Sequence, residues 1–305
     1  MTRKFDSPSP VPFGWHGLEF AVPPDWELAA YGGNRAAGYA SLDDGERVRL
    51  RVQWQNSANA PPELSKTVER YRRLVRKQEG VPTDFETLER GIAPKRFRQG
   101  KETCVFRWLQ DPLRYGVAWK CKTCRRTVLM ETVVPEGVDG GDTVRTLLSS
   151  ARDHAEDDWA LWAVYGFAFR MRSSYNLENT QLHSGHLLFS FRQARHDWVN
   201  VERWGMAHEL LRRVPFEAWP EELLTRTRLG GARIVEREEA GADGCCEHRF
   251  MAEGRRKGFL SVLSRPLQLE GVVRSFPEED KIVTVLAAGP ARDCLGRVMS
   301  TVRCR

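Results

Sequence analysis

Two cysteines three positions apart, Cys121 and Cys124, form the sharpest chemical motif of the sequence. Thiolates at this spacing can share one tetrahedral Zn²⁺, because a tight turn directs both sulfur atoms to the same side. A structural zinc site needs four ligands, and no second Cys-x-x-Cys is present. Cys104 or the adjacent pair Cys245 and Cys246 could supply the others. The motif therefore indicates either a zinc site or the tip of a β-hairpin.

A thiol-exchange role is another interpretation of the same pair. Thioredoxin-type Cys-x-x-Cys motifs open a helix, whose N-terminus lowers the pKa of the thiol. The residues around Cys121 and Cys124 instead read as strands, at Tyr115–Lys120 and at Thr127–Val134. The flanks therefore favour a hairpin tip or a metal site over redox chemistry.

Basic side chains are concentrated around this motif. The segment Lys66–Arg126 holds 17 Lys or Arg and 7 Asp or Glu, a net charge of +10 in a chain whose total is +6. Such a region could contact phosphates, with Phe97 or Trp108 available for stacking. Arg-rich solvated faces are also common, and Glu69 offers a local ion-pair partner. The candidate contacts to nucleic acid or another acidic partner are Arg70, Arg73, Arg76, Lys77, Lys95, Arg96, Lys120, Lys122, Arg125 and Arg126.

Positive signs of an enzyme are missing from the sequence. His183 and His186 would converge only on a helix, and the Ser-Gly between them predicts a turn. The sequence contains no G-x-S-x-G, P-loop, G-x-G-x-x-G or H-E-x-x-H motif, nor a helix-turn-helix or zinc-finger signature. No cofactor other than zinc is indicated.

Composition is typical of a globular protein. Of 305 residues, 41% are hydrophobic and 29% charged, and the longest apolar runs are too short to span a bilayer. The basic start of the chain is not followed by an apolar stretch, so it does not read as a secretory signal. Seven cysteines at irregular spacing do not suit a disulfide framework. We therefore expect a cytoplasmic protein without a membrane span.

Periodicity predicts the elements that position these residues. Strands are predicted at 13–22 and 38–42. In the run 47–54 apolar residues alternate with Arg or Gln, the period of a half-buried strand. Helical spacing follows over 64–75, with further strands at 85–91, 102–108, 115–120 and 127–134 and a closing helix over 142–157.

The same order recurs in the second half of the chain. Strands are predicted at 165–172, 185–191 and 198–204, then a helix around Phe216–Leu224. Further strands follow at 232–238, 246–252, 259–264, 270–276 and 282–288, before a final helix over 295–302. Gly116-Val-Ala-Trp and Gly271-Val-Val-Arg occupy equivalent places. We therefore predict two tandem α+β domains of similar topology, residues 1–158 and 159–305, each an antiparallel sheet with helices. The apolar segment Trp159–Tyr165 is expected to pack between them or to begin the second sheet.

The opening strand Leu18–Val22 runs directly into Pro-Pro-Asp and Trp26. This stretch and the element order resemble the PsbP-like fold, shared by the extrinsic protein of photosystem II, the nuclear-import Ran-binding factor and bacterial DcrB-type proteins. The resemblance implies protein binding, as in the similar Eag-type chaperones, which cradle effector helices between paired domains. It carries no single residue of a binding site with it.

Three functional hypotheses follow. The first is a non-enzymatic protein-binding, scaffolding or chaperone-like protein, because two sheets side by side offer a long surface to a protein or peptide partner. The second is association with nucleic acid through the basic region 66–126. The third is a zinc- or thiol-dependent activity at Cys121 and Cys124.

Overall fold

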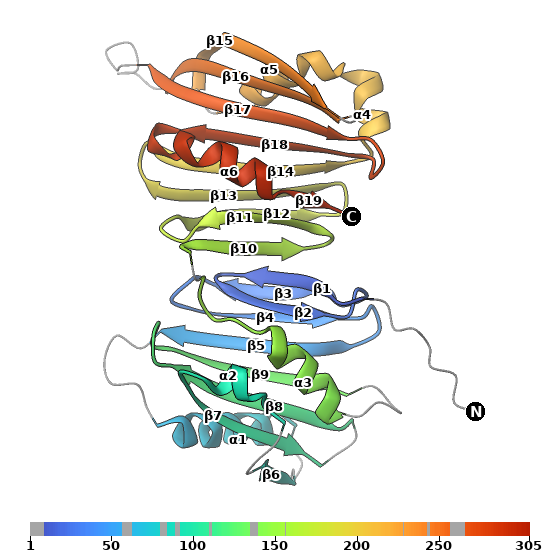
Figure 1. Ribbon diagram of the computed structural model, residues 1–305, viewed down its shortest axis with the longest axis vertical. Helices are drawn as coiled ribbons and strands as arrows, with labels where there is room; N and C mark the ends of the chain where they lie inside the picture. The colour runs from blue at the N-terminus through green and yellow to red at the C-terminus, as the bar shows by residue number, and fades with distance from the viewer. Residues whose placement is uncertain are drawn as a thin grey trace, which may run out of the picture. The chain divides into compact units, whose positions relative to one another are not determined.

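The computed structural model describes residues 9–56, 63–79, 84–88, 92–109, 112–134, 140–155, 157–227, 229–242, 245–256 and 266–305. The protein is an α+β chain built mostly of antiparallel strands (Figure 1). It divides into two compact units, residues 1–165 and 166–305. None of the described helices is both long enough and apolar enough to cross a membrane.

The first unit is organised around an antiparallel sheet of seven strands. In spatial order these are β3 (Glu27–Gly33), β4 (Ala37–Asp43), β5 (Val48–Asn56), β9 (Arg126–Val133), β8 (Arg114–Cys121), β7 (Lys101–Trp108) and β6 (Phe85–Leu88). The alternation in β5 is that of the predicted strand: Leu50 and Val52 are buried, and Arg51 between them is exposed. β3, which the sequence pattern does not predict, is an edge strand with mostly exposed residues.

Three further strands of this unit pair with one another, in the order β2 (Leu18–Val22), β1 (Val11–Trp15) and β10 (Trp159–Val164). β10 is the apolar Trp-rich segment of the sequence, and Trp162 packs edge-on against Trp15 with ring centroids 5.3 Å apart. Because β10 pairs with β1, the first compact unit extends beyond the predicted boundary at residue 158.

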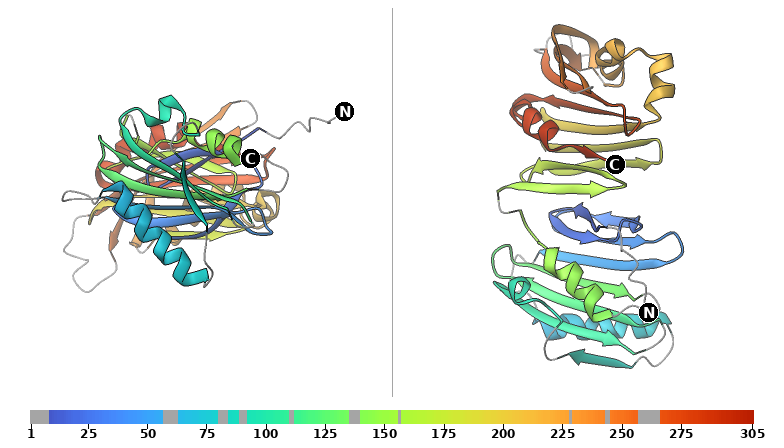
Figure 2. Two further views of the ribbon diagram at one scale, coloured as in Figure 1. Left: turned by 90° about the horizontal axis from the view of Figure 1, so that it is seen from below. Right: turned by 45° about the vertical axis from the view of Figure 1, so that its right-hand side comes forward.

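Helices cover both faces of the seven-stranded sheet (Figure 2). α1 (Leu64–Glu79) packs Leu64 and Val68 against Phe106 and Trp108. α2 (Lys95–Arg98) and α3 (Gly140–Ser150) lie on the other face, where the Phe97 ring contacts Trp119 at 5.2 Å. Side chains of adjacent strand residues point to opposite faces of the sheet. Ala118 therefore packs against α1, and the next residue, Trp119, packs against α2.

The closing helix of this unit is shorter than predicted. α3 ends at Ser150, whereas the sequence predicts a helix to residue 157. The Ser150 hydroxyl accepts a hydrogen bond from the Ala21 amide at 2.8 Å, and Arg152 forms an isolated antiparallel bridge with Glu19. Because of these tertiary hydrogen bonds the helix ends at Ser150, and Asp153 and His154 lie in an irregular segment after it.

The second unit repeats the same sheet, which confirms the predicted similarity of topology. Its spatial order is β12 (Asn176–His183), β13 (His186–Ala194), β14 (Asp197–Gly205), β18 (Lys281–Ala288), β17 (Leu267–Phe276), β16 (Cys245–Arg256) and β15 (Leu229–Ala242). In both sheets three strands run in chain order, the last strand pairs with the third, and the remaining strands return outward. β12 is not predicted from the sequence, and the strand predicted at 259–264 lies outside the described residues.

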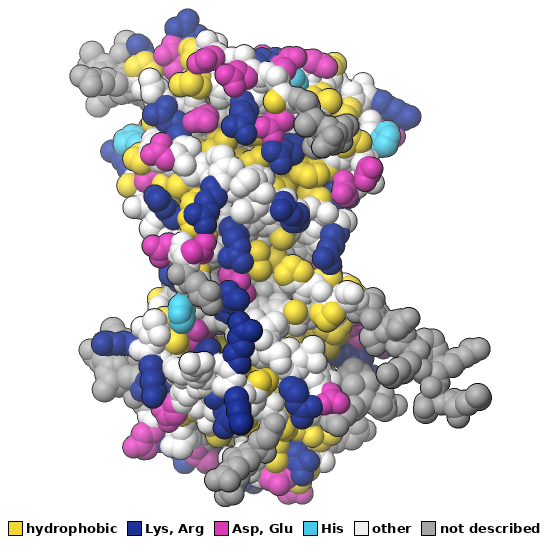
Figure 3. Space-filling view, in the orientation of Figure 1, with side chains coloured by type: hydrophobic (Ala, Val, Ile, Leu, Met, Phe, Trp, Pro, Cys, Tyr) yellow, Lys and Arg dark blue, Asp and Glu magenta, His cyan; other side chains and the backbone are white. Residues whose placement is uncertain are grey.

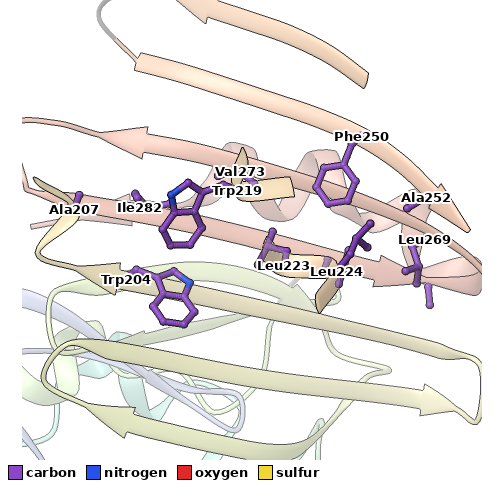
Figure 4. Packing of buried hydrophobic residues seen from close by; sticks show 12 residues of the cluster. Trp204, Ala207, Trp219, Leu223, Leu224, Phe250, Ala252, Leu269, Val273 and Ile282 are labelled. Atoms are coloured by element: carbon purple, nitrogen blue, oxygen red, sulfur yellow. The ribbon is translucent and has the colours of Figure 1, made fainter. Parts of the chain in front are cut away.

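The other described elements of the second unit are β11 (Phe167–Arg172), α4 (Ala207–Arg213), a 3₁₀ helix (Phe216–Ala218), α5 (Trp219–Thr225), a further 3₁₀ helix (Gly289–Cys294), α6 (Leu295–Thr301) and β19 (Arg303–Cys304). α5 packs on the sheet through Trp219, Leu223 and Leu224, which meet Trp204 and Phe250 in one buried cluster (Figure 4). This cluster fills the space between helix and sheet.

One cross-strand pair recurs at equivalent places of the two sheets. Phe106 lies opposite Gly116 in the first, and Phe250 lies opposite Gly271 in the second. Each ring lies over its glycine, so that a Cβ atom on either glycine would come within 2.1 Å of ring carbons. The echo of Gly116 and Gly271 in the sequence therefore marks a packing requirement, a strand residue that must leave room for an aromatic ring.

We expect Gly271→Ala to lower the free energy of unfolding by about 1–3 kcal/mol, because the added methyl group would overlap the buried Phe250 ring and force it to shift. The control is Gly296→Ala in α6, where a Cβ atom would meet nothing within 4 Å and where helix propensity favours alanine. Urea unfolding of the full chain measures both. Equal stability of the two variants would contradict the packing of Phe250 over Gly271.

Candidate functional site

A groove of about 780 Å³ lies between α1 and the sheet of the first unit. It exists because α1 packs over β7 and β8 and leaves β4 and β5 uncovered on this face, where Gly38 and Ala37 carry little side chain. The helix side of the groove is formed by Thr67, Arg70, Tyr71 and Leu74. The sheet side includes Tyr39, Gln53, Gln55, Thr127 and Leu129.

The groove combines apolar surface with one cation. Leu74 is 52% exposed and Tyr39 47% exposed, both high values for large apolar side chains. Arg70 is also exposed, and no carboxylate of the described residues lies within ion-pair distance of it. Its neighbour Arg73, in contrast, donates to Glu69 at 3.1 Å. A guanidinium beside exposed apolar groups suits a ligand that has both a hydrophobic and a carboxylate group.

Buried polar contacts hold α1 in place beside the groove. Tyr71 hydrogen-bonds to Glu131, which also accepts a hydrogen bond from the Trp108 indole at 2.7 Å and lies 3.6 Å from the Arg114 guanidinium. Burial raises the pKa values of both Tyr71 and Glu131. Helix α1 is therefore held beside the groove by this hydrogen-bonded network as well as by apolar packing.

The ten basic residues predicted to contact nucleic acid or another acidic partner do not gather on one face. Arg70, Arg73, Arg76 and Lys77 lie on α1, Lys120 on β8, Lys122 and Arg125 in the turn after it, and Lys95 and Arg96 on α2, across the sheet from α1. Figure 3 shows the face that carries α2 and α3, where Lys and Arg side chains alternate with other types.

Arg126 is a correction to that prediction, because it is 2% exposed. Its guanidinium donates to the carbonyl oxygens of His16 at 3.0 Å and Arg35 at 2.9 Å, to that of Asp153 at 3.3 Å, and to the Asn56 side chain at 3.2 Å. Arg126 therefore joins distant segments inside the unit and presents no surface for a partner.

Cys121 and Cys124 lie together in the turn between β8 and β9, as their spacing predicts. Two further ligand-type side chains, Asp153 and His154, join them, and one donor atom of each residue lies within 4.8 Å of the others. Cys104 is on β7, outside this group, and Cys246 is exposed on β16. The Cys245 side chain lies outside the described residues.

Sequence reasoning missed Asp153 and His154 because it places them in a helix. No periodic signal marks them, since they follow the early end of α3. Within the group, the hydrogen bond with Cys124 lowers the pKa of Cys121, and the same bond raises the pKa of Cys124. The cluster thus favours one thiolate even without a metal ion.

Comparisons with known proteins give similar structures only. No family model and no curated protein matches the sequence. The immunity protein TplEi of the type VI secretion system of Pseudomonas aeruginosa, solved with an "L" peptide, is 12% identical, with 98% of this chain and 99% of that chain covered and a TM-score of 0.39. The Tle4–Tli4 complex gives 13% identity, 99% coverage of both chains and a TM-score of 0.38. The cyanobacterial PsbP of Synechocystis sp. PCC 6803 is 12% identical over 50% of this chain and 95% of that one, with a TM-score of 0.33. At these TM-scores a function has to be argued from the chain's own residues.

His16, whose carbonyl binds Arg126, occupies an unusual place for a histidine. It is buried in the turn between β1 and β2 with a φ of 50°, and its ring lies 5.1 Å from Trp162 and 5.7 Å from Trp54. Burial lowers its pKa from 6.5 to about 4, and the nearby guanidinium groups of Arg126 and Arg35 act in the same direction. The folded protein therefore keeps this imidazole neutral in mild acid.

We expect His16 to make the first unit sensitive to acid. Its contribution to stability is complete above pH 6.5 and is lost as the pH falls toward 4, because the unfolded chain then takes up a proton that folded His16 does not. Between pH 7 and pH 5 the unfolding free energy of the unaltered chain should fall by about 2 kcal/mol because of His16. In His16→Asn, where asparagine tolerates the positive φ, this part of the decrease should be absent.

Urea titrations at the two pH values measure this difference. The matched control is His183→Asn, since His183 is exposed at the end of β12. An unchanged pH dependence in His16→Asn would show that another group causes the acid sensitivity.

Proposed function

We propose that the chain is a non-enzymatic protein-binding protein that holds a short segment of its partner in the groove beside α1. The observation that carries the proposal is the exposure of Leu74 and Tyr39 beside Arg70, in a groove of about 780 Å³. Large apolar side chains clustered at a concave surface favour a ligand that removes them from water.

The chemistry of the groove specifies the segment. Burial of Leu74 and Tyr39 contributes about 25 cal/mol for each Å² of apolar surface, which favours a bulky apolar residue in the partner. Arg70 favours an Asp or Glu next to that residue, and Lys77, one heptad further along α1, extends the positive charge. The glutamine amides of Gln53 and Gln55 supply hydrogen bonds to the peptide backbone. The expected ligand is therefore an acidic segment with one large apolar side chain.

Binding is favoured over catalysis by the composition of the groove. The described residues that line it include no His, Cys, Asp, Glu or Lys, the side chains that most often act as nucleophile or general base. What they offer is apolar surface, amides, hydroxyls and one guanidinium, which is the chemistry of recognition.

The nucleic-acid hypothesis stays a prediction from charge. Its candidate residues lie on both faces of the first sheet, and Arg126 is buried, so the described residues do not form one continuous phosphate-binding surface.

Peptide selection tests the proposal and does not require an identified partner. The full chain is used to select from a random peptide display library, and affinities of the selected peptides are measured by fluorescence anisotropy. We expect peptides with an Asp or Glu beside a bulky apolar residue. Arg70→Glu should weaken their binding about tenfold or more, because it replaces an attraction by a repulsion.

Arg73→Glu is the matched control, because it makes the same charge change on the same helix outside the groove lining. It should change the affinity less than about twofold beyond the general effect of net charge. Equal loss in the two variants, or selected peptides without acidic residues, would contradict binding in this groove.

A further inference from the structure

The donor atoms of Cys121, Cys124, Asp153 and His154 are close enough together to bind one metal ion. Neighbouring ligand atoms around a tetrahedral Zn²⁺ are about 3.3–3.8 Å apart, given Zn–S and Zn–N bonds of about 2.3 and 2.0 Å. The Cys121 Sγ atom lies 3.7 Å from His154 Nδ1, and all four donors fall within 4.8 Å of one another. His154 Nδ1 and Asp153 Oδ1 are 2.9 Å apart, a hydrogen bond that a bound ion would replace. The four donors are therefore close to the spacing of a single tetrahedral site.

The turn that carries the cysteines brings both sulfur atoms to the segment that holds Asp153 and His154. The Cys121 sulfur faces the His154 ring, and the Cys124 sulfur lies 3.9 Å from the carbonyl oxygen of Asp153. Arg125, directly after the second cysteine, has a φ of 56°, which turns the chain back into β9.

The carboxylate of Asp153 is held in the orientation that a ligand needs. Its Oδ2 atom accepts a hydrogen bond from the Trp119 indole at 3.0 Å, and its Oδ1 atom lies 2.9 Å from His154 Nδ1. Outer donors of this kind fix a metal ligand before the ion binds. Asp153 is buried, and the Trp119 ring is itself packed against Phe97.

Charge balance also fits a zinc ion. Zn²⁺ with two thiolates, one carboxylate and a neutral imidazole has a net charge of −1. The hydrogen-bond acceptors of the Arg126 guanidinium are all neutral oxygens, although the group is 2% exposed, and its carbonyl acceptor on Asp153 places the positive charge next to the cluster. The loaded site and this buried cation would neutralise each other, which a buried charge requires.

We propose that Cys121, Cys124, Asp153 and His154 bind one structural Zn²⁺. All four positions of the ion are filled by protein groups, and this is the arrangement of structural rather than catalytic zinc. The ion connects the β8–β9 turn to the segment that joins α3 to β10, two parts of the first unit that are separated in the sequence by β9 and α3. Its role is to fix that segment, and it does not depend on peptide binding in the groove.

Metal binding is tested on the full chain: a chelator first removes bound metal under reducing conditions, and Zn²⁺ is then added back. We expect one Zn²⁺ per chain by elemental analysis after gel filtration, thiolate-to-metal charge-transfer absorption on Co²⁺ substitution, and a higher unfolding temperature with Zn²⁺ than without it. Cys124→Ser and Asp153→Asn should each weaken Zn²⁺ binding about tenfold or more.

Cys104→Ser is the matched control, because Cys104 is on a neighbouring strand outside the cluster, and it should bind Zn²⁺ like the unaltered chain. Circular dichroism of the metal-free proteins checks that each variant folds. Sub-stoichiometric zinc in the unaltered folded protein, a Cys121–Cys124 disulfide in its place, or equal affinity in Cys124→Ser and Cys104→Ser would overturn the proposal.

Discussion

The antiparallel pairing of β5 with β9 is the contact on which the first unit depends. It joins the three strands at the start of the sheet to the strands that return from the far edge, and it runs from Leu50 opposite Thr132 to Asn56 opposite Arg126. Gln53 faces Leu129 across this pairing, so it forms part of the groove floor. At the other end of the pairing lie Arg126 and the cysteine turn, both where β9 begins. Both candidate sites are therefore positioned by one register.

That register is imposed by burial. A shift of one residue would turn Leu50, Val52 and Trp54 from the core to the α1 face and bring Arg51 into the interior. The same constraint acts on β14 and β18 of the second unit, where Val199 and Val201 are buried across from Ala287 and Val285. Each sheet thus has a single favourable alignment at its centre.

Much of this fold could be predicted from the sequence, and the failures have physical causes. Strands with one buried face show alternation, and the recurring glycines of β8 and β17 mark equivalent places. The edge strands β3 and β12 escape prediction because an edge strand exposed on both faces does not need a regular apolar pattern. The cysteine pair is visible by spacing alone. Its partners Asp153 and His154 are not, because the end of α3 is set by the bridge between Arg152 and Glu19, which are distant in sequence. The groove cannot be predicted from the sequence either, because its walls depend on the packing of α1 against strands that are distant in sequence.

The pairing of β10 with β1 has a practical consequence for anyone who expresses the first unit alone. A fragment that stops at residue 158 would lack β10 and leave the β1 edge, next to Phe13 and Trp15, open to other chains. Unpaired apolar edges of this kind recruit strands from neighbouring molecules and lead to aggregation. A fragment that continues through Tyr165 keeps β1 paired with β10, as well as the hydrogen bond from the Tyr165 amide to Glu27 at 3.0 Å. The shorter fragment would thus be prone to aggregation through β1, whatever the packing of its core.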